Sequence, residues 1–162
     1  MQLPDAIAHA TAPVFDALPL EQAMPELVPS GDASAPVLEA VKHAVSDPTL
    51  ADYPGLRAGL WLYADALDAS HDISQAMPDP TGSYWHAIMH RREGDFSNSK
   101  YWYRQAGDHP AIQAVPDTPG FDPFAFVDRV AADDGGATHA ELVTLQRQEW
   151  ATLFQWCASH PG

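Results

Sequence analysis

The sequence has few cationic side chains and only one cysteine, and these shortages exclude several classes of protein. Its 162 residues carry 8 Lys and Arg against 22 Asp and Glu, a formal net charge of −14 at pH 7. So acidic a chain repels the phosphates of nucleic acids and of anionic membrane surfaces, so neither is expected as a partner. A single cysteine, Cys157, excludes an internal disulfide framework and is typical of a reducing cytoplasm, where we expect the protein.

Long apolar runs, alternating apolar patterns and nucleotide-binding motifs are absent as well. No stretch approaches the roughly 18 apolar residues that a membrane-spanning helix needs, and the N-terminus lacks the positive region of a secretory signal. No period-two alternation predicts a strand, and no P-loop, dinucleotide fingerprint or G-x-S-x-G elbow is present. The apolar fraction of 46% still predicts a folded core, so an all-α domain is the expected fold class.

Proline divides the sequence into two parts. Six prolines occur within residues 1–36, a spacing that argues against long helices and predicts an extended N-terminal arm packed on the core. Residues 37–162 are expected to form one compact helical domain. Its helices are predicted from a cap at Ser34 to Asp47, over 54–75, over 83–93, from Asp95 or Ser97 to Gln105, from Asp122 to Val130 and from Thr138 to Ser159, with a loop over 106–120.

The predicted helix YWHAIMHRRE, residues 84–93, carries the clearest chemical pattern. His86, His90 and Glu93 fall at i, i+4 and i+7, so at 3.6 residues per turn they share one stripe. His71 would lie level with this pair if its own helix and the next one form an antiparallel hairpin. Three converging imidazoles can hold a divalent metal such as zinc and leave one position open for water. We therefore predict that His71, His86 and His90 are metal ligands and that these three residues and Glu93 are catalytic.

The same region holds half of the cations of the chain. Segment 84–107 contains four Lys or Arg and two acidic residues, a balance of +2, whereas the other four basic and twenty acidic residues balance at −16. The turn GDFSNS adds hydroxyls and backbone N–H groups at a predicted helix N-terminus, a combination that favours a small anion. The residues expected to bind this ligand are Gln75, Arg91, Asn98, Lys100, Trp102 and Arg104.

These patterns leave three functional hypotheses open, and they leave the oligomeric state undetermined. The first is a His-rich pocket that binds a small anionic molecule, with metal-dependent hydrolysis as its reaction. The second is a non-catalytic helical module that binds a small molecule or a partner protein. In the third, the segment is a polar network that stabilises a helix junction: Ser97 and Asn98 cap a helix, and Arg91 pairs with Asp95.

One string in this region resembles known sequences. The run YWHAIMHRREGDFSNSKYW, with LWLYADALDASHDISQ before it, is similar to a segment shared by uncharacterised bacterial and fungal proteins of similar size. The resemblance covers residues 61–104 and implies no established activity. In length and in the use of three histidines the chain also resembles helical-bundle metal proteins of the DinB kind. Those proteins place an H-x-x-x-H late in the chain, whereas the predicted final helix here has none.

Overall fold

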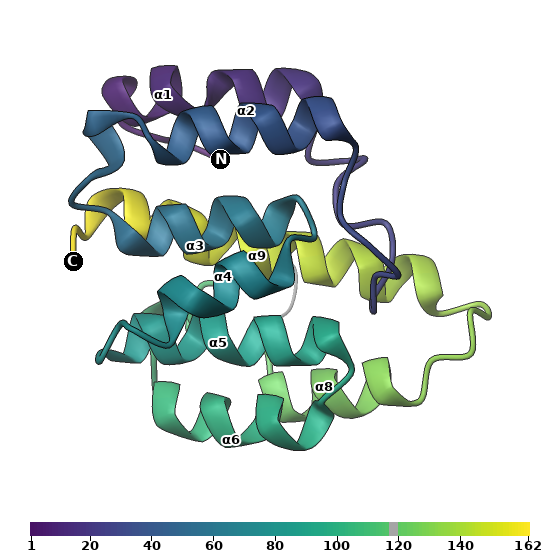
Figure 1. Ribbon diagram of the computed structural model, residues 1–162. Helices are drawn as coiled ribbons and strands as arrows, with labels where there is room; N and C mark the ends of the chain where they lie inside the picture. The colour runs from purple at the N-terminus through teal and green to yellow at the C-terminus, as the bar shows by residue number, and fades with distance from the viewer. Residues whose placement is uncertain (117–119) are drawn as a thin grey trace.

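The computed structural model describes residues 1–116 and 120–162, and these residues form helices joined by turns (Figure 1). Within them the chain contains nine α-helices, one short 3-10 helix (η1) and no strand, so the predicted all-α class is confirmed. The elements are α1 (Asp5–Ala17), α2 (Ala35–Val45), η1 (Pro48–Leu50), α3 (Pro54–Tyr63), α4 (Leu67–Ser74), α5 (Pro80–Glu93), α6 (Phe96–Ala106), α7 (Pro110–Gln113), α8 (Pro123–Ala131) and α9 (His139–Ser159).

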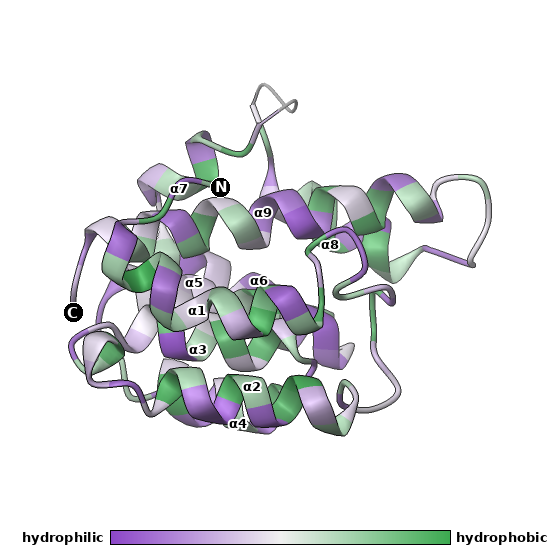
Figure 2. Ribbon diagram, turned by 90° about the horizontal axis from the view of Figure 1, so that it is seen from above, coloured by the Kyte–Doolittle hydropathy of each residue, from purple (hydrophilic) through white to green (hydrophobic). Residues whose placement is uncertain are grey.

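The helices pack in tiers with α5 inside the stack. Figure 1 shows α1 and α2 at one end and α6 and α8 at the other, with α3, α4, α5 and α9 between them. Helix α5 packs on α4 and α6, and α3 packs on α4 and α9. Most helices carry both hydrophilic and hydrophobic residues along their length (Figure 2), as expected for helices with one buried and one exposed face. None of the described helices is long and apolar enough to cross a membrane.

Helix α5 differs from the others because it is polar and yet buried. Asp79 caps its start by accepting a hydrogen bond from the backbone N–H of Gly82 at 2.7 Å, and Gly94 ends it in the left-handed region, at φ 86°. Every residue from 82 to 92 is buried. Buried polar groups must find partners within the protein. The histidines and arginines of this helix therefore meet different neighbouring helices, and that arrangement defines the candidate site.

The helix predicted over residues 54–75 is divided into α3 and α4. The break is centred on Asp65, which adopts a left-handed conformation with φ 57°, a region that Asp tolerates better than most residues. The Asp65 carboxylate pairs with the Arg92 guanidinium of α5 at 2.6 Å. This buried ion pair joins the break to α5, and α4, which follows the break, packs on α5.

The prediction of an extended arm over residues 1–36 is not supported. Helix α1 occupies much of that segment, with Pro13 inside it and Ile7 and Val14 in the core. An interior proline costs about 3 kcal/mol of helix stability, and burying apolar side chains on one face of α1 offsets that cost. Residues 1–4 and 18–34 of this segment lack helix and strand, and residues 18–34 run as turns and bends between α1 and α2.

Several of the remaining boundaries follow local signals, but four predictions differ from the structure. Helix α5 begins at Pro80 and not at residue 83, and the predicted cap Ser34 makes no side-chain hydrogen bond at the start of α2. Asp95 caps α6 through the backbone N–H of Asn98 at 3.1 Å, and Asp122 caps α8 through that of Phe124 at 2.9 Å. The capping box predicted at Thr138 does not form, because Thr138 makes no side-chain cap hydrogen bond. The loop predicted over 106–120 contains α7, and residues 117–119 of that loop lie outside the described residues.

Candidate metal centre

Three histidines from α4 and α5 meet in one cluster, as the histidine spacing predicted. His71 comes from α4, and His86 and His90 lie one turn apart on α5. One ring nitrogen from each of the three lies within 4.8 Å of the others. The His86 and His90 rings stack with centroids 4.7 Å apart, and the His71 ring stands edge-on to His86 at 4.6 Å. We name these three residues the histidine cluster.

Neighbouring side chains orient His90. Its Nδ1 lies 2.9 Å from Glu93 Oε2, and its Nε2 lies 3.0 Å from Asn98 Nδ2. An ionised carboxylate can only accept hydrogen bonds, so Nδ1 carries the proton and donates it to Glu93. Nε2 then holds the lone pair and accepts a hydrogen bond from the Asn98 amide. A carboxylate behind a ligating imidazole is a recurrent feature of metal sites, because it sets the tautomer and aims the free nitrogen.

His86 is the most enclosed member of the histidine cluster. Its side chain lies between the His90 ring and the indole of Trp102, which stacks on it at 4.0 Å with an interplanar angle of 13°. The buried Nδ1 of His86 has no hydrogen-bond partner among the described residues. Burial, and then the proximity of His90 and His71, lowers the pKa of His86 from 6.5 to about 4. The ring is therefore neutral at pH 7, the form that can ligate a metal.

The histidine cluster fits a divalent metal ion in chemistry, and it nearly fits in spacing. Zinc binds imidazole nitrogen at about 2.0–2.1 Å, which places two tetrahedral ligand atoms about 3.3 Å apart. The distances between the ring nitrogens, which are now up to 4.8 Å, therefore have to shorten when an ion binds. His90 must also exchange its hydrogen bond to Asn98 for the ion. Side-chain rotations can achieve both changes, because the backbone already brings the three rings into contact.

The free energy of unfolding of the metal-free protein is expected to depend on the ionisation of His86. The folded pKa of about 4 lies below the ordinary value of 6.5, so the unfolded chain binds more protons between these values. The contribution of the neutral His86 ring to the free energy of unfolding is therefore complete above about pH 6.5 and decreases as the pH falls toward 4. The expected loss at pH 4 is about 3 kcal/mol, since one pKa unit corresponds to about 1.4 kcal/mol. Urea denaturation in chelator at several pH values measures it.

The matched control for this pH dependence is His86→Phe, which keeps an aromatic ring beside Trp102 but cannot be protonated. The difference in unfolding free energy between wild type and variant should change across pH 4–6.5 and stay constant above it. A constant difference over the whole range would contradict the assignment, because other acidic and imidazole groups titrate in both proteins.

The other residues predicted to bind ligand divide into two groups. Asn98 and Trp102, both on α6, contact the histidine cluster directly. Gln75 does not contact it through any described hydrogen bond. It is exposed at the C-terminal end of α4, where its amide nitrogen Nε2 donates a hydrogen bond to Asp72 Oδ1 at 3.3 Å.

Arg91 faces away from the histidine cluster and is fully buried. Its Nη2 lies 2.6 Å from Glu149 Oε2 on α9, and its Nη1 donates to the Tyr103 hydroxyl at 2.6 Å. The Tyr103 hydroxyl donates in turn to Glu149 Oε1 at 2.7 Å. Successive residues of a helix are rotated by about 100°, so Arg91 cannot share the face of His90. Its expected role in orienting an anion does not fit this position, and its partner is Glu149, not Asp95.

The other two predicted cations are also engaged elsewhere. Lys100 pairs with Asp128 of α8. The Arg104 guanidinium lies 5.9 Å from the ring centroid of Phe124, also on α8. The charged groups that lie next to the histidine cluster are instead carboxylates. Glu93 bonds His90, and Asp95 lies close enough to His90 for the imidazole to contribute to the lowered pKa of Asp95, whose largest cause is the hydrogen bond from the Asn98 backbone.

Sequence patterns missed the residues that hold α5 in place. Glu149, Tyr103 and Asp65 each bind an arginine of this helix. A helical pattern shows which residues share a face, but it does not show which distant helix will meet that face. Glu149 carried one usable signal: it lies on the same face of α9 as the apolar residues Leu142, Leu145 and Leu153, where a carboxylate requires a buried partner.

Comparisons with known proteins add no assignment to this geometry. No protein-family model matches the chain, no curated protein matches it in sequence, and no solved structure matches it.

Proposed function

We propose that the histidine cluster binds a divalent transition metal ion, with zinc as the first candidate. The observation that carries the proposal is the convergence of three imidazole nitrogens within 4.8 Å from two helices. Neutral imidazole is a preferred ligand of zinc and of other late first-row metals. Two further features support the proposal. His86 has a buried nitrogen without a partner among the described residues, and Glu93 leaves the Nε2 lone pair of His90 available.

Metal-dependent hydrolysis is the reaction that we propose for such a centre. Three protein ligands leave one position open, and zinc in such a site lowers the pKa of a bound water to about 7. The residues around that position have separate tasks. Glu93 holds the proton of His90 Nδ1 and so aims the opposite nitrogen. Trp102 covers the outer face of His86 and keeps water from it. Asn98, displaced from His90, becomes a neutral hydrogen-bond donor beside the centre.

A small anion remains the proposed ligand, for a reason other than the one first expected. The arginines near the histidine cluster are directed to α9 and to the break between α3 and α4. The attraction for an anion would instead come from the ion itself, since three neutral imidazoles leave its double positive charge uncompensated. The freed Asn98 amide would add one hydrogen bond. Carboxylate and phosphate groups are the ligand classes that fit.

Metal titration tests the proposed function. Protein freed of metal with chelator is titrated with Zn²⁺ by calorimetry and with Co²⁺ by visible absorption. We expect one ion per chain, and an intense Co²⁺ band of the kind given by four-coordinate sites. Asn98→Ala should bind the ion about fivefold more tightly, because the ion no longer competes with a hydrogen bond of about 1 kcal/mol.

His139→Ala is the matched control for this titration. His139 is also a histidine beside a carboxylate, at 2.7 Å from Asp133, but it lies at the start of α9. Its removal should leave the stoichiometry and affinity unchanged. If wild-type protein binds no ion, or if His139→Ala and His90→Ala lower binding equally, the metal proposal is wrong. The imidazoles would then belong to a polar network that stabilises the junction of α4, α5 and α6.

A further inference from the structure

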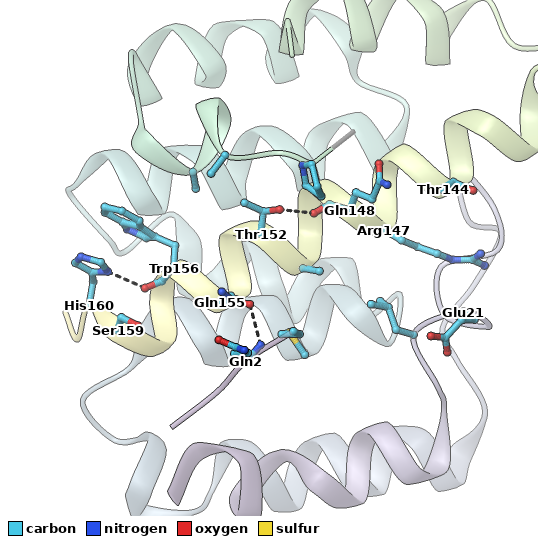
Figure 3. A pocket seen from close by; sticks show the side chains of 16 residues that line it. Gln2, Glu21, Thr144, Arg147, Gln148, Thr152, Gln155, Trp156, Ser159 and His160 are labelled. Atoms are coloured by element: carbon cyan, nitrogen blue, oxygen red, sulfur yellow. Dashed lines mark hydrogen bonds between the residues drawn. The ribbon is translucent and has the colours of Figure 1, made fainter. Parts of the chain in front are cut away.

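A second candidate site lies along α9 and shares no residue with the histidine cluster. It is a groove of about 800 Å³, lined along α9 from Thr144 to His160 (Figure 3). Three other segments form its sides: the first two residues, the Leu20–Glu21 turn, and the α7 region at Ala111 and Ala114. Small-molecule sites in proteins have volumes of about 300–1,000 Å³. We name this feature the α9 groove.

The apolar part of the α9 groove contains small side chains and one indole. Ala111, Ala151 and Leu20 line it, and Trp156 stands at one end. The Trp156 ring is held in place on two sides, stacked on His160 with centroids 3.8 Å apart and edge-on to His109 at 5.3 Å. A fixed indole beside small residues offers a flat apolar surface to a ligand without an entropic cost for ordering the side chain.

Arg147 lines the polar part of the α9 groove, and it forms no ion pair with a carboxylate of the described residues. Five of the other basic residues, at positions 42, 91, 92, 100 and 129, form ion pairs. Within the described residues no carboxylate lies within 4.0 Å of the Arg147 guanidinium, which donates from Nε to the backbone carbonyl of Ala23 at 2.7 Å. That hydrogen bond orients the side chain and leaves the two Nη groups, the fork that suits a carboxylate. Figure 3 shows Arg147 extended along the groove.

Glu21 also lines the α9 groove, and it limits which anions can bind there. Figure 3 shows the side chains of Glu21 and Arg147 in the same part of the groove, without an interaction drawn between them. A ligand with one carboxylate can meet Arg147 and turn its other end away from Glu21. A second carboxylate on a short ligand would be repelled, because the protein as a whole is strongly acidic, with a net charge of −14.

We propose that the α9 groove binds an amphipathic monocarboxylate with an extended apolar chain. Its carboxylate would bind the Nη groups of Arg147, and its chain would run along α9 past Ala151 to Trp156. Trp156 follows Arg147 by nine positions, which is a rise of about 13 Å along α9 and half a turn about its axis, so the ligand would cross the exposed face of α9 diagonally over at least this distance. A saturated carboxylate of about ten carbons has this length. The apolar lining then contacts the chain, and the Arg147 guanidinium contacts the charge.

Decanoate is the probe for the α9 groove, used below its micelle concentration and in the presence of chelator. The chelator keeps this test independent of any metal bound by the histidine cluster. We expect saturable binding of one decanoate per chain by calorimetry, with clearly weaker binding of decanol. Arg147→Gln should weaken decanoate binding about tenfold or more, because charge-assisted hydrogen bonds to the carboxylate are lost. Decanol binding should not change.

Two controls separate charge and shape. Arg129→Gln removes a cation that pairs with Glu141 outside the groove, so decanoate binding should be unchanged. Ala151→Phe fills the groove and should abolish binding while circular dichroism still shows a helical protein. Glu21→Gln should improve the binding of a short dicarboxylate, butanedioate, more than that of decanoate. The proposal is overturned if decanoate does not saturate, if decanol binds equally well, or if Arg147→Gln and Arg129→Gln have equal effects.

Discussion

Replacing Glu149 with leucine is expected to lower the free energy of unfolding by about 3–5 kcal/mol, the largest stability effect that we expect from a single substitution. Glu149 and Arg91 are both fully buried, and their side chains lie 2.6 Å apart. Without the carboxylate, the Arg91 guanidinium stays buried with the Tyr103 hydroxyl and the Phe126 ring as its remaining partners. Neither carries a charge that compensates for the loss of water around the cation. Urea denaturation of wild type and variant measures the difference.

Two further variants show whether the charge is the cause. The double variant Arg91→Met, Glu149→Leu removes both charges and should recover most of the loss, because apolar pairs of similar volume often replace buried ion pairs at little cost. Glu141→Leu breaks the exposed pair with Arg129 and should cost less than about 1 kcal/mol. If the double variant is as unstable as Glu149→Leu, the side chains matter through their shape, and the explanation by an uncompensated charge is wrong.

Replacing His86 with phenylalanine should abolish metal-dependent stabilisation while leaving the metal-free fold at least as stable at pH 7. Phenylalanine keeps the stack on Trp102 and removes a buried nitrogen that has no partner among the described residues. In wild type, zinc at one hundred times its dissociation constant should stabilise the folded state by about 2.7 kcal/mol. The variant should show almost none of this gain. Thermal or urea denaturation with and without zinc measures both quantities.

The same variant separates the metal hypothesis from the structural one. If the histidine cluster only stabilises a helix junction, His86→Phe should destabilise the metal-free protein and zinc should not change the stability of wild type. If zinc stabilises wild type and the variant equally, the ion binds elsewhere in the chain. His71→Ala is a second variant for the same test. His71 is less buried than the other two members of the histidine cluster, so its removal leaves a smaller cavity.

Local signals in the sequence predicted part of the histidine cluster, whereas the approach of His71 to the other two depended on the packing of α4 against α5. The i, i+4 spacing of His86 and His90 predicted that both rings lie on one stripe of α5, and an assumed antiparallel hairpin was the basis for expecting His71 level with them. The starts of α6 and α8 were also predictable, because Asp95 and Asp122 cap them through contacts within three residues. The two caps and the stripe of His86 and His90 depend on neighbours along the chain, and helical geometry fixes the positions of such neighbours.

The sequence by itself determined which residues share a face of a helix, and only the tertiary structure decided what each face meets. The cations of α5 looked like a ligand site because their sequence neighbours are polar. They are buried because α9 brings Glu149 to Arg91 and the break after α3 brings Asp65 to Arg92. The α9 groove likewise depends on segments from the two ends of the chain. Helical periodicity acts over a few residues, whereas these pairings result from how the whole core packs.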